Sequence, residues 1–378
     1  MKANLPEIVF WLSAAFIFYT YVGYPFLLFS LSKFKIFPTK KGPVKLSVSV
    51  VIAVRNEAGQ IEKRLKNLCA QDYPPEKMEV LVVSDGSVDN TDTIIESFSD
   101  KRVRLIKMEQ SAGKAVAVNA GVAAASGEII VFADARQTFE PNVLAELVAN
   151  FSDPAVGCVG GELVFLDSQD STVRTEMGTY WCYEKAIRRK ESDTGSAIGV
   201  SGCNYALRKV LYQPLPSGTI LDDVLTPMNI IRQGYRVIFE PAAMAYDVIS
   251  NNAHQEWKRK VRTLTGNWQL LSLASWLLLP WRNVGCFRFI SHKICRLCIP
   301  MALLLLLISA FISEAIFYKW SAFVQPAFYA VAFLGMISPK IRKVKVIGLA
   351  YFFVLLNTAV VLGFWRWLRG GSEKVWGS

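Results

Sequence analysis

The chain has 378 residues, of which 52% are hydrophobic, and a formal net charge of +11 at pH 7. This combination is typical of a membrane protein with basic cytoplasmic edges and is unusual for a soluble enzyme. Nucleic-acid binding is not favoured, because the lysines and arginines cluster beside apolar segments and not along one soluble face.

Four segments are uncharged, apart from Glu314, over the ~20 residues that a membrane-spanning helix needs. They are residues 8–32, 297–318, 320–339 and 346–365. The first has no small-residue cleavage site, so we expect a retained anchor and not a cleaved signal peptide. Basic residues follow the first segment, precede the second and separate the third from the fourth. The positive-inside rule therefore predicts a multi-pass inner-membrane protein with residues 33–296 in the cytoplasm, although four full crossings would leave its basic tail outside.

Strand and helix patterns alternate between the first two apolar segments. Residues 46–54, 78–84, 103–108 and 129–133 are almost continuously apolar and rich in β-branched residues, as strands buried on both faces are. Helices are predicted over residues 60–71, 90–98 and 113–126, and another after Pro141. This succession predicts an α/β fold with a mainly parallel sheet covered by helices on both faces.

Polar residues follow each predicted strand. They read RNE, SDGSVDNT, SAGK and DARQ, in chain order. Each alone is ordinary turn chemistry, but sheets of this kind bind ligands beyond the carboxyl ends of their strands, where the four motifs converge. The chain lacks both a GxxxxGK phosphate loop and a GxGxxG motif after the first strand, which removes the main support for a kinase, an ATPase or a dehydrogenase.

Together these motifs resemble the family 2 glycosyltransferases, inverting enzymes with the GT-A nucleotide-sugar fold. The resemblance covers roughly residues 46–270. VSVVIAVRNE is similar to the opening strand and turn of that family, VVSDGSVDNT to its acidic loop and GKAVAVNAG to its lysine-bearing helix. VFADARQ occupies the position of its metal motif, and ILDDV that of its catalytic acids. The apolar segments resemble those of its membrane-integrated members, relatives of cellulose, chitin and hyaluronan synthases.

The resemblance implies a set of donor-binding residues. Nucleotide contacts are implied for Ala53, Arg55, Glu57 and Asp85. Lys114 is implied to approach the nucleotide or its diphosphate, and the alternative is a solvated lysine at a helix start.

Asp134 and Arg136 stand at the metal-motif position, after the fourth predicted strand. The resemblance implies that Asp134 contacts the donor and holds Mg²⁺ or Mn²⁺; otherwise it is only the polar end of a buried strand. One carboxylate is enough for Mg²⁺, which keeps several waters and binds substrate phosphates. Arg136 is always cationic, so it is no ligand and either points away or contacts the donor diphosphate.

Inverting transfer requires a base that takes the proton of the acceptor hydroxyl. TILDDVLTP contains Asp222 and Asp223, and the resemblance implies that Asp223 is the catalytic base while Asp222 supports it or contacts the acceptor. The alternative is that the two acids only favour a helix start through its dipole.

Residues 256–268 form a predicted basic helix. Arg259 and Arg262 lie three residues apart and share a helix face, where they are candidates for binding the diphosphate or the acceptor. Processive relatives carry Gln-x-x-Arg-Trp at this position, and this chain lacks both the glutamine and the tryptophan. That difference favours single transfer. The alternative is a basic helix facing solvent or lipid headgroups.

The sequence therefore predicts four parts. They are an anchor with a basic linker (1–45), a cytoplasmic GT-A domain (46–267), an interfacial helix and linker (268–293) and a C-terminal membrane region of about three helices (294–378). The expected function is sugar transfer from a nucleotide-sugar donor, expected to be UDP-linked, to a lipid-linked or glycan acceptor at the bilayer, in envelope or exported polysaccharide synthesis. A processive synthase that exports its product is the alternative, and a non-catalytic nucleotide-binding scaffold is a third.

Overall fold

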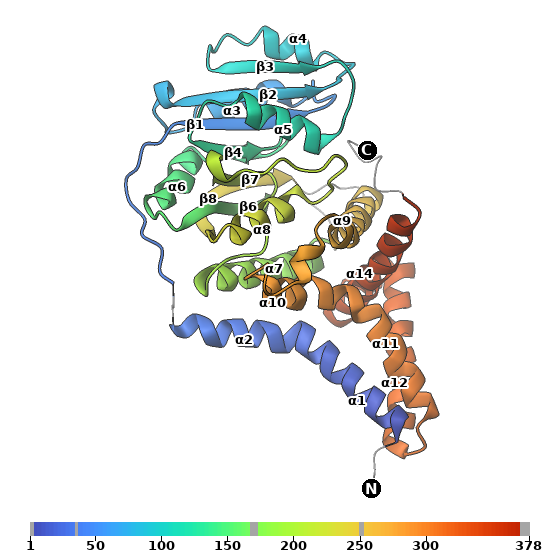
Figure 1. The fold of residues 1–378 in the computed structure, drawn as a ribbon. Helices are drawn as coiled ribbons and strands as arrows, with labels where there is room; N and C mark the ends of the chain where they lie inside the picture. Colours follow the sequence, from blue (N-terminus) through green and yellow to red (C-terminus); the bar gives the residue numbers. More distant parts are fainter. Residues whose placement is uncertain (1–3, 35–36, 167–172, 249–252, 371–378) are drawn as a thin grey trace.

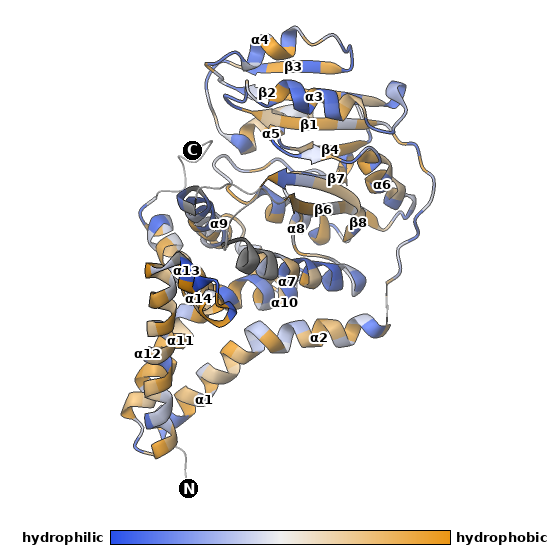
Figure 2. Cartoon of the chain, turned by 180° about the vertical axis from the view of Figure 1, so that it is seen from behind, coloured by the Kyte–Doolittle hydropathy of each residue, from blue (hydrophilic) through white to orange (hydrophobic). Residues whose placement is uncertain are grey.

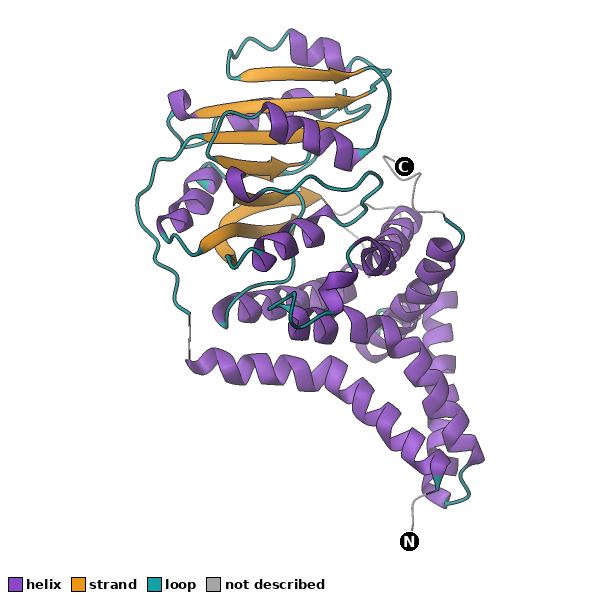
Figure 3. Cartoon of the chain, viewed as in Figure 1, coloured by secondary structure: helices purple, strands orange, loops and turns teal. Residues whose placement is uncertain are grey.

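A computed structural model of the protein describes residues 4–34, 37–166, 173–248 and 253–370. A sheet flanked by helices forms one end of the molecule, and long helices form the other (Figure 1). Figure 3 shows that the strands are confined to the first part.

The sheet has eight strands in the order β3-β2-β1-β4-β7-β6-β8-β5. The strands are β1 (Val48–Val54), β2 (Met78–Asp85), β3 (Val103–Met108), β4 (Ile129–Ala133), β5 (Thr138–Phe139), β6 (Val156–Leu166), β7 (Asn204–Arg208) and β8 (Arg236–Val248). The first four strands are parallel to one another, as predicted. β7 is antiparallel to β4 and β6, and β5 to β8, so the whole sheet is mixed.

Helices cover both faces of the sheet because its strands are apolar on both sides. Val50 and Ile52 of β1 pack with α3 (Ile61–Cys69) and α6 (Val143–Ala149). Val51, between them, faces the opposite core with α5 (Lys114–Ala124) and α8 (Asp222–Arg232), as the two-residue period of a strand requires. α4 (Thr91–Glu96) lies beside β3 at the sheet edge. α5 lies so close to β1 that a Cβ at Gly121 would be 2.5 Å from Val51 Cγ1.

Four helical segments are long and apolar enough to cross a membrane: Leu5–Phe34, Cys286–Ile312, Ile316–Ile337 and Lys345–Leu368. They correspond to the four predicted segments, although the second begins before the predicted residue 297. The helices within them include α1 (Leu5–Phe18), α2 (Tyr24–Leu31), α10 (Cys286–Phe289), α11 (Cys295–Ile312), α12 (Ile316–Ile337) and α14 (Lys345–Leu368). Figure 2 shows that hydrophobic residues predominate along these helices, in contrast to the mixed surface of the sheet domain.

Two further long helices, α7 (Val173–Asp193) and α9 (Ala253–Leu273), lie between the sheet and the apolar helices (Figure 1). The part predicted as an interfacial helix and linker (268–293) begins with the last residues of α9, which ends at Leu273, and continues with a 3-10 turn at Ser275–Leu278. Leu270, Ala274 and Leu277 of this segment are buried in the same core as α8. Leu273, Leu278 and Trp281 of the same segment are exposed, so protein covers only part of its apolar surface.

A buried ionic cluster joins α2, α7 and the π-helical turn Ile290–Ile294 that precedes α11. His292 Nδ1 lies 2.8 Å from Glu191 Oε1, and His292 Nε2 lies 3.1 Å from Glu184 Oε2. The Tyr24 hydroxyl donates to Glu191 at 2.7 Å, and Arg296 pairs with Glu184. These contacts fix α7, which carries residues near the candidate active site, to the apolar helices.

Candidate active site

Lys114 connects the two acidic motifs that the sequence singled out. Its Nζ lies 3.1 Å from Asp134 Oδ1 and 3.6 Å from Asp222 Oδ2. Lys114 is the first residue of α5, Asp134 directly follows β4, and Asp222 is the first residue of α8. Burial alone would lower the pKa of Lys114, but the carboxylates of Asp134 and Asp222 raise it, so the ammonium stays charged between them.

Asp85, at the end of β2, is completely buried. Its carboxylate accepts hydrogen bonds from Ser111 Oγ at 2.8 Å and from the backbone N–H groups of Ala112 at 2.7 Å and Gly113 at 3.0 Å. Gly113 has φ +93°, a conformation that favours glycine. In this structure Asp85 therefore holds the turn that places Lys114, while its predicted contact with the nucleotide stays a prediction.

The end of β1 lies beside Asp134, because Ile52 pairs with Ala133 in the parallel register. Ala53 and Arg55 are partly buried there. Arg55 Nε is buried and has no hydrogen-bond partner among the described residues. A buried donor without a partner is costly, so this atom is a candidate contact for an anionic ligand.

Glu57 follows in the same turn and is partly buried. Burial raises the pKa of Glu57, Arg136 opposes that rise, and Asp134 adds to it. These mutual effects place Glu57, Asp134 and Arg136 near one another. Arg136 is exposed, as expected for a side chain that contacts a ligand or solvent.

Asp223 lies beside Asp222 in the first turn of α8, where the helix dipole favours acids. Asp222 is buried, whereas Asp223 is partly exposed. Burial and the neighbouring Asp222 raise the pKa of Asp223 to about 6, against the opposing effect of Lys293, Lys114 and Arg188. A carboxylate with a pKa close to neutrality is suited to general-base catalysis.

Arg188 and Lys293 were not predicted from the sequence. Arg188, on α7, donates to Ser201 Oγ at 2.9 Å. Ser201 precedes Gly202, where an added Cβ would lie 3.3 Å from Asp223 Cβ. Lys293 belongs to the π-helical turn before α11. No short motif indicates either residue, because both reach the acid pair only through the packing of distant helices.

Arg259 and Arg262 lie on α9, which packs against the segment before the acid pair. Gln269 accepts from the N–H of Ile220 at 3.0 Å, and an added Cβ at Gly266 would lie 2.6 Å from Leu221 Cγ. Arg262 and Arg259 precede Gly266 by four and seven residues, so they share its face of α9. Helix periodicity therefore places both arginines on the face of α9 that carries Gly266, and Arg259 also pairs with Glu256 at 3.4 Å.

Gln137, three residues after Asp134, was not predicted from the sequence as a site residue. Its Nε2 donates to Asp247 Oδ2 at 2.8 Å, while its Oε1 is buried and has no partner in the described part of the chain. The described ranges contain no group of three His, Cys, Asp or Glu side chains that could hold a metal ion. The candidate metal ligand named from the sequence is thus the single Asp134 carboxylate, which is 33% exposed. It fits a hard divalent cation that takes its other ligands from water and substrate phosphates.

Comparison with known proteins gives consistent matches. Residues 49–214 match the family model "Glycosyl transferase family 2". The chain is 25% identical over 229 residues to a poly-beta-1,6-N-acetyl-D-glucosamine synthase of Staphylococcus aureus (strain MSSA476), which covers 59% of this chain and 55% of the relative. It is 21% identical over 360 residues to the Staphylococcus epidermidis protein of that name, covering 88% and 86%. The chain thus spans about half the length of the Staphylococcus aureus relatives that it matches.

The fold match extends over almost the whole chain. It covers 96% of this protein and 99% of the mannosyltransferase PcManGT from Pyrobaculum calidifontis, solved in complex with GDP-Man and Mn²⁺, with a TM-score of 0.70 and 21% identity. The predicted GT-A type architecture, with apolar helices at both ends, is therefore confirmed.

Proposed function

We propose that the protein is a membrane-bound inverting glycosyltransferase, because residues 49–214 match the model of glycosyl transferase family 2. It transfers a sugar from a nucleotide-sugar donor to a lipid-linked or glycan acceptor in envelope or exported polysaccharide synthesis. The observation that carries this proposal is the contact of Lys114 with both Asp134 and Asp222, because it joins the donor side of the sheet to the acid pair. The relatives named as poly-N-acetylglucosamine synthases support the pathway.

In the proposed reaction, Asp223 accepts the proton of the acceptor hydroxyl, whose oxygen attacks C1 of the sugar. The bond from C1 to the diphosphate breaks on the opposite face, so the configuration inverts. Negative charge develops on the departing diphosphate, and Lys114, Arg136 and the α9 arginines supply compensating positive charge. A divalent cation held by Asp134 would neutralise the same phosphates. Arg55 and Glu57 bind the nucleotide, while Asp85 positions Lys114.

The proposal is tested by incubating purified full-length protein with a panel of UDP- and GDP-linked sugars, with and without a membrane lipid extract, and measuring released nucleoside diphosphate. We expect release from one class of donor and stimulation by the extract. Binding of nucleotide without release under any condition would identify a scaffold. Product length distinguishes the two enzymatic alternatives, because single transfer adds one sugar and a processive synthase makes a long chain.

We also propose that residues 33–296 lie in the cytoplasm, where nucleotide sugars are made. A peptide tag inserted beside Ser99, an exposed residue after α4, is expected to react with antibody only after the membrane is permeabilised. The basic residues that flank the apolar segments are the physical reason for this orientation. Labelling of the tag in intact cells would show that this part of the chain lies outside the cytoplasm, away from the nucleotide-sugar donor.

A further inference from the structure

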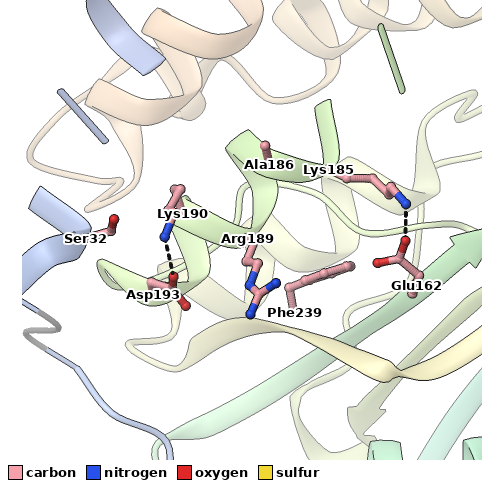
Figure 4. A pocket seen from close by; sticks show the side chains of 8 residues that line it. All are labelled: Ser32, Glu162, Lys185, Ala186, Arg189, Lys190, Asp193 and Phe239. Carbon is pink, nitrogen blue, oxygen red and sulfur yellow. Dashed lines mark hydrogen bonds and ion pairs between the residues drawn. The ribbon is translucent and has the colours of Figure 1, made fainter. Parts of the chain in front are cut away.

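A groove that the proposed reaction does not use lies beside α7. It has a volume of about 660 Å³ and is bordered by Ser32 after α2, by one face of α7 and by Phe239 of β8 (Figure 4). Three basic residues of α7, Lys185, Arg189 and Lys190, line it. Arg188, which donates to Ser201 beside the acid pair, is not among the residues that line this groove, so the groove is distinct from the candidate active site.

The charges in the groove are only partly compensated. Lys185 pairs with Glu162, and Lys190 Nζ lies 3.4 Å from Asp193 Oδ2. Arg189 lies between these pairs and its guanidinium extends toward Phe239 (Figure 4). Within the described ranges it has no hydrogen bond or ion pair. The groove therefore has one excess positive charge, on a side chain whose planar donors suit phosphate oxygens.

The course of the chain through α2 is the basis for inferring that this groove lies beside a membrane surface. The chain bends at the π-helical turn Tyr19–Gly23, and α2 runs beneath α7, whereas α11 and α12 extend away from the sheet domain (Figure 1). Residues 5–23 alone approach the ~20 residues of a membrane span, which leaves α2 free to lie along the surface.

The two faces of α2 support the same arrangement. Tyr24 and Leu28 are buried against Ile187 of α7. Phe26 and Phe29, on other sides of α2, are 71% and 45% exposed. A helix that is covered by protein on one side and presents aromatic residues on the other suits the interface of a bilayer. Lys190 Nζ lies 5.6 Å from the centre of the Phe29 ring, so the groove and the apolar surface adjoin.

We propose that this groove binds the phosphate of an anionic phospholipid, with Arg189 as the principal contact and the lipid chains alongside the exposed face of α2. A lipid is favoured over a soluble anion because the groove adjoins apolar surface, and basic pockets at the cytoplasmic edge of membrane helices attract anionic headgroups. This inference rests on the membrane integration proposed above but not on the reaction, and it assigns α7 two roles, a contact with lipid through Arg189 and a contact near the acid pair through Arg188.

The test is native mass spectrometry of the full-length protein in detergent, titrated with phosphatidylglycerol or phosphatidylcholine. We expect tighter binding of phosphatidylglycerol, weakened by Arg189→Glu by about fivefold or more, the effect of one basic residue at a membrane surface. Arg189→Gln removes the charge without reversing it and is expected to show a smaller loss. Lys63→Glu, at an exposed lysine of α3, makes the same charge change away from the groove and should alter binding by less than about twofold.

Equal binding of both lipids, or unchanged phosphatidylglycerol binding by both Arg189 variants, would overturn the proposal. Displacement of the lipid by inorganic phosphate alone would also overturn it, since the groove would then be a site for a soluble anion. Nucleoside diphosphate release by Arg189→Glu without added phosphatidylglycerol is expected to equal that of the unaltered protein. Failure of the lipid site is thereby distinguishable from failure of the proposed reaction.

Discussion

Replacing Asp223 with asparagine is expected to reduce sugar transfer by about a hundredfold or more, within the range that a general base contributes. The amide has nearly the same shape as the carboxylate but does not accept a proton from the acceptor hydroxyl. Donor binding should be almost unchanged, because the residues implied to contact the nucleotide lie on β1, in the turn after it and at the end of β2, whereas Asp223 lies in the first turn of α8. Measurement of kcat, together with the donor Kd, separates the two effects.

The dependence of this reaction on pH provides an independent check. The base is active when deprotonated, and burial beside Asp222 raises the pKa of Asp223 to about 6. Transfer by the unaltered protein should therefore fall as the pH decreases through about 6, and Asp223→Asn should lose this limb of the profile. Asp72→Asn, at an exposed acid outside the site, should stay within about twofold of the unaltered protein. Turnover of Asp223→Asn within about threefold of the unaltered rate would remove this residue from the mechanism.

The parallel half of the sheet could be predicted because its strands have a local signature. Residues 103–108 and 129–133 form strands with the predicted boundaries, and the polar motifs after β1, β2 and β4 lie along one edge. The positions of β5 to β8 in the sheet could not be predicted in this way, because these strands pair with strands that are distant in the sequence. β7, for example, pairs with β4 about 75 residues earlier in the chain.

Local motifs likewise predicted some of the site residues, whereas residues that meet only through long-range contacts were missed. Short motifs indicated Asp134 and Asp222, but no local pattern shows that Lys114 lies between them. Gln137 and Asp247 are 110 residues apart and meet only because β5 pairs with β8. Asp85 is the opposite case, because its motif is recognisable in the sequence. Only the folded structure shows that its carboxylate accepts three hydrogen bonds from the turn before α5.

Replacing Asp134 with asparagine is expected to abolish transfer, with a larger loss than Arg136→Ala causes. Asp134 is the carboxylate available to a divalent cation at the edge where the diphosphate should lie, and it is also the closest partner of Lys114. An amide there loses the charge that attracts the cation and leaves Lys114 with Asp222 alone. Arg136 is exposed, and its proposed role is to supply supplementary positive charge, so its loss should leave the proposed cation site and Lys114 in place.

The role of the cation is separated from that of Lys114 by measuring Mn²⁺ binding directly, by electron paramagnetic resonance in the presence of nucleoside diphosphate. Asp134→Asn should weaken Mn²⁺ binding, whereas Arg136→Ala should retain it, and transfer by the unaltered protein should require Mg²⁺ or Mn²⁺. Full activity in excess chelator would contradict the metal assignment and show that basic side chains alone stabilise the leaving group. In that case Asp134 would act by holding Lys114, and Lys114→Met should cause a loss as large as Asp134→Asn does, because both changes would remove the same ion pair from the end of β4.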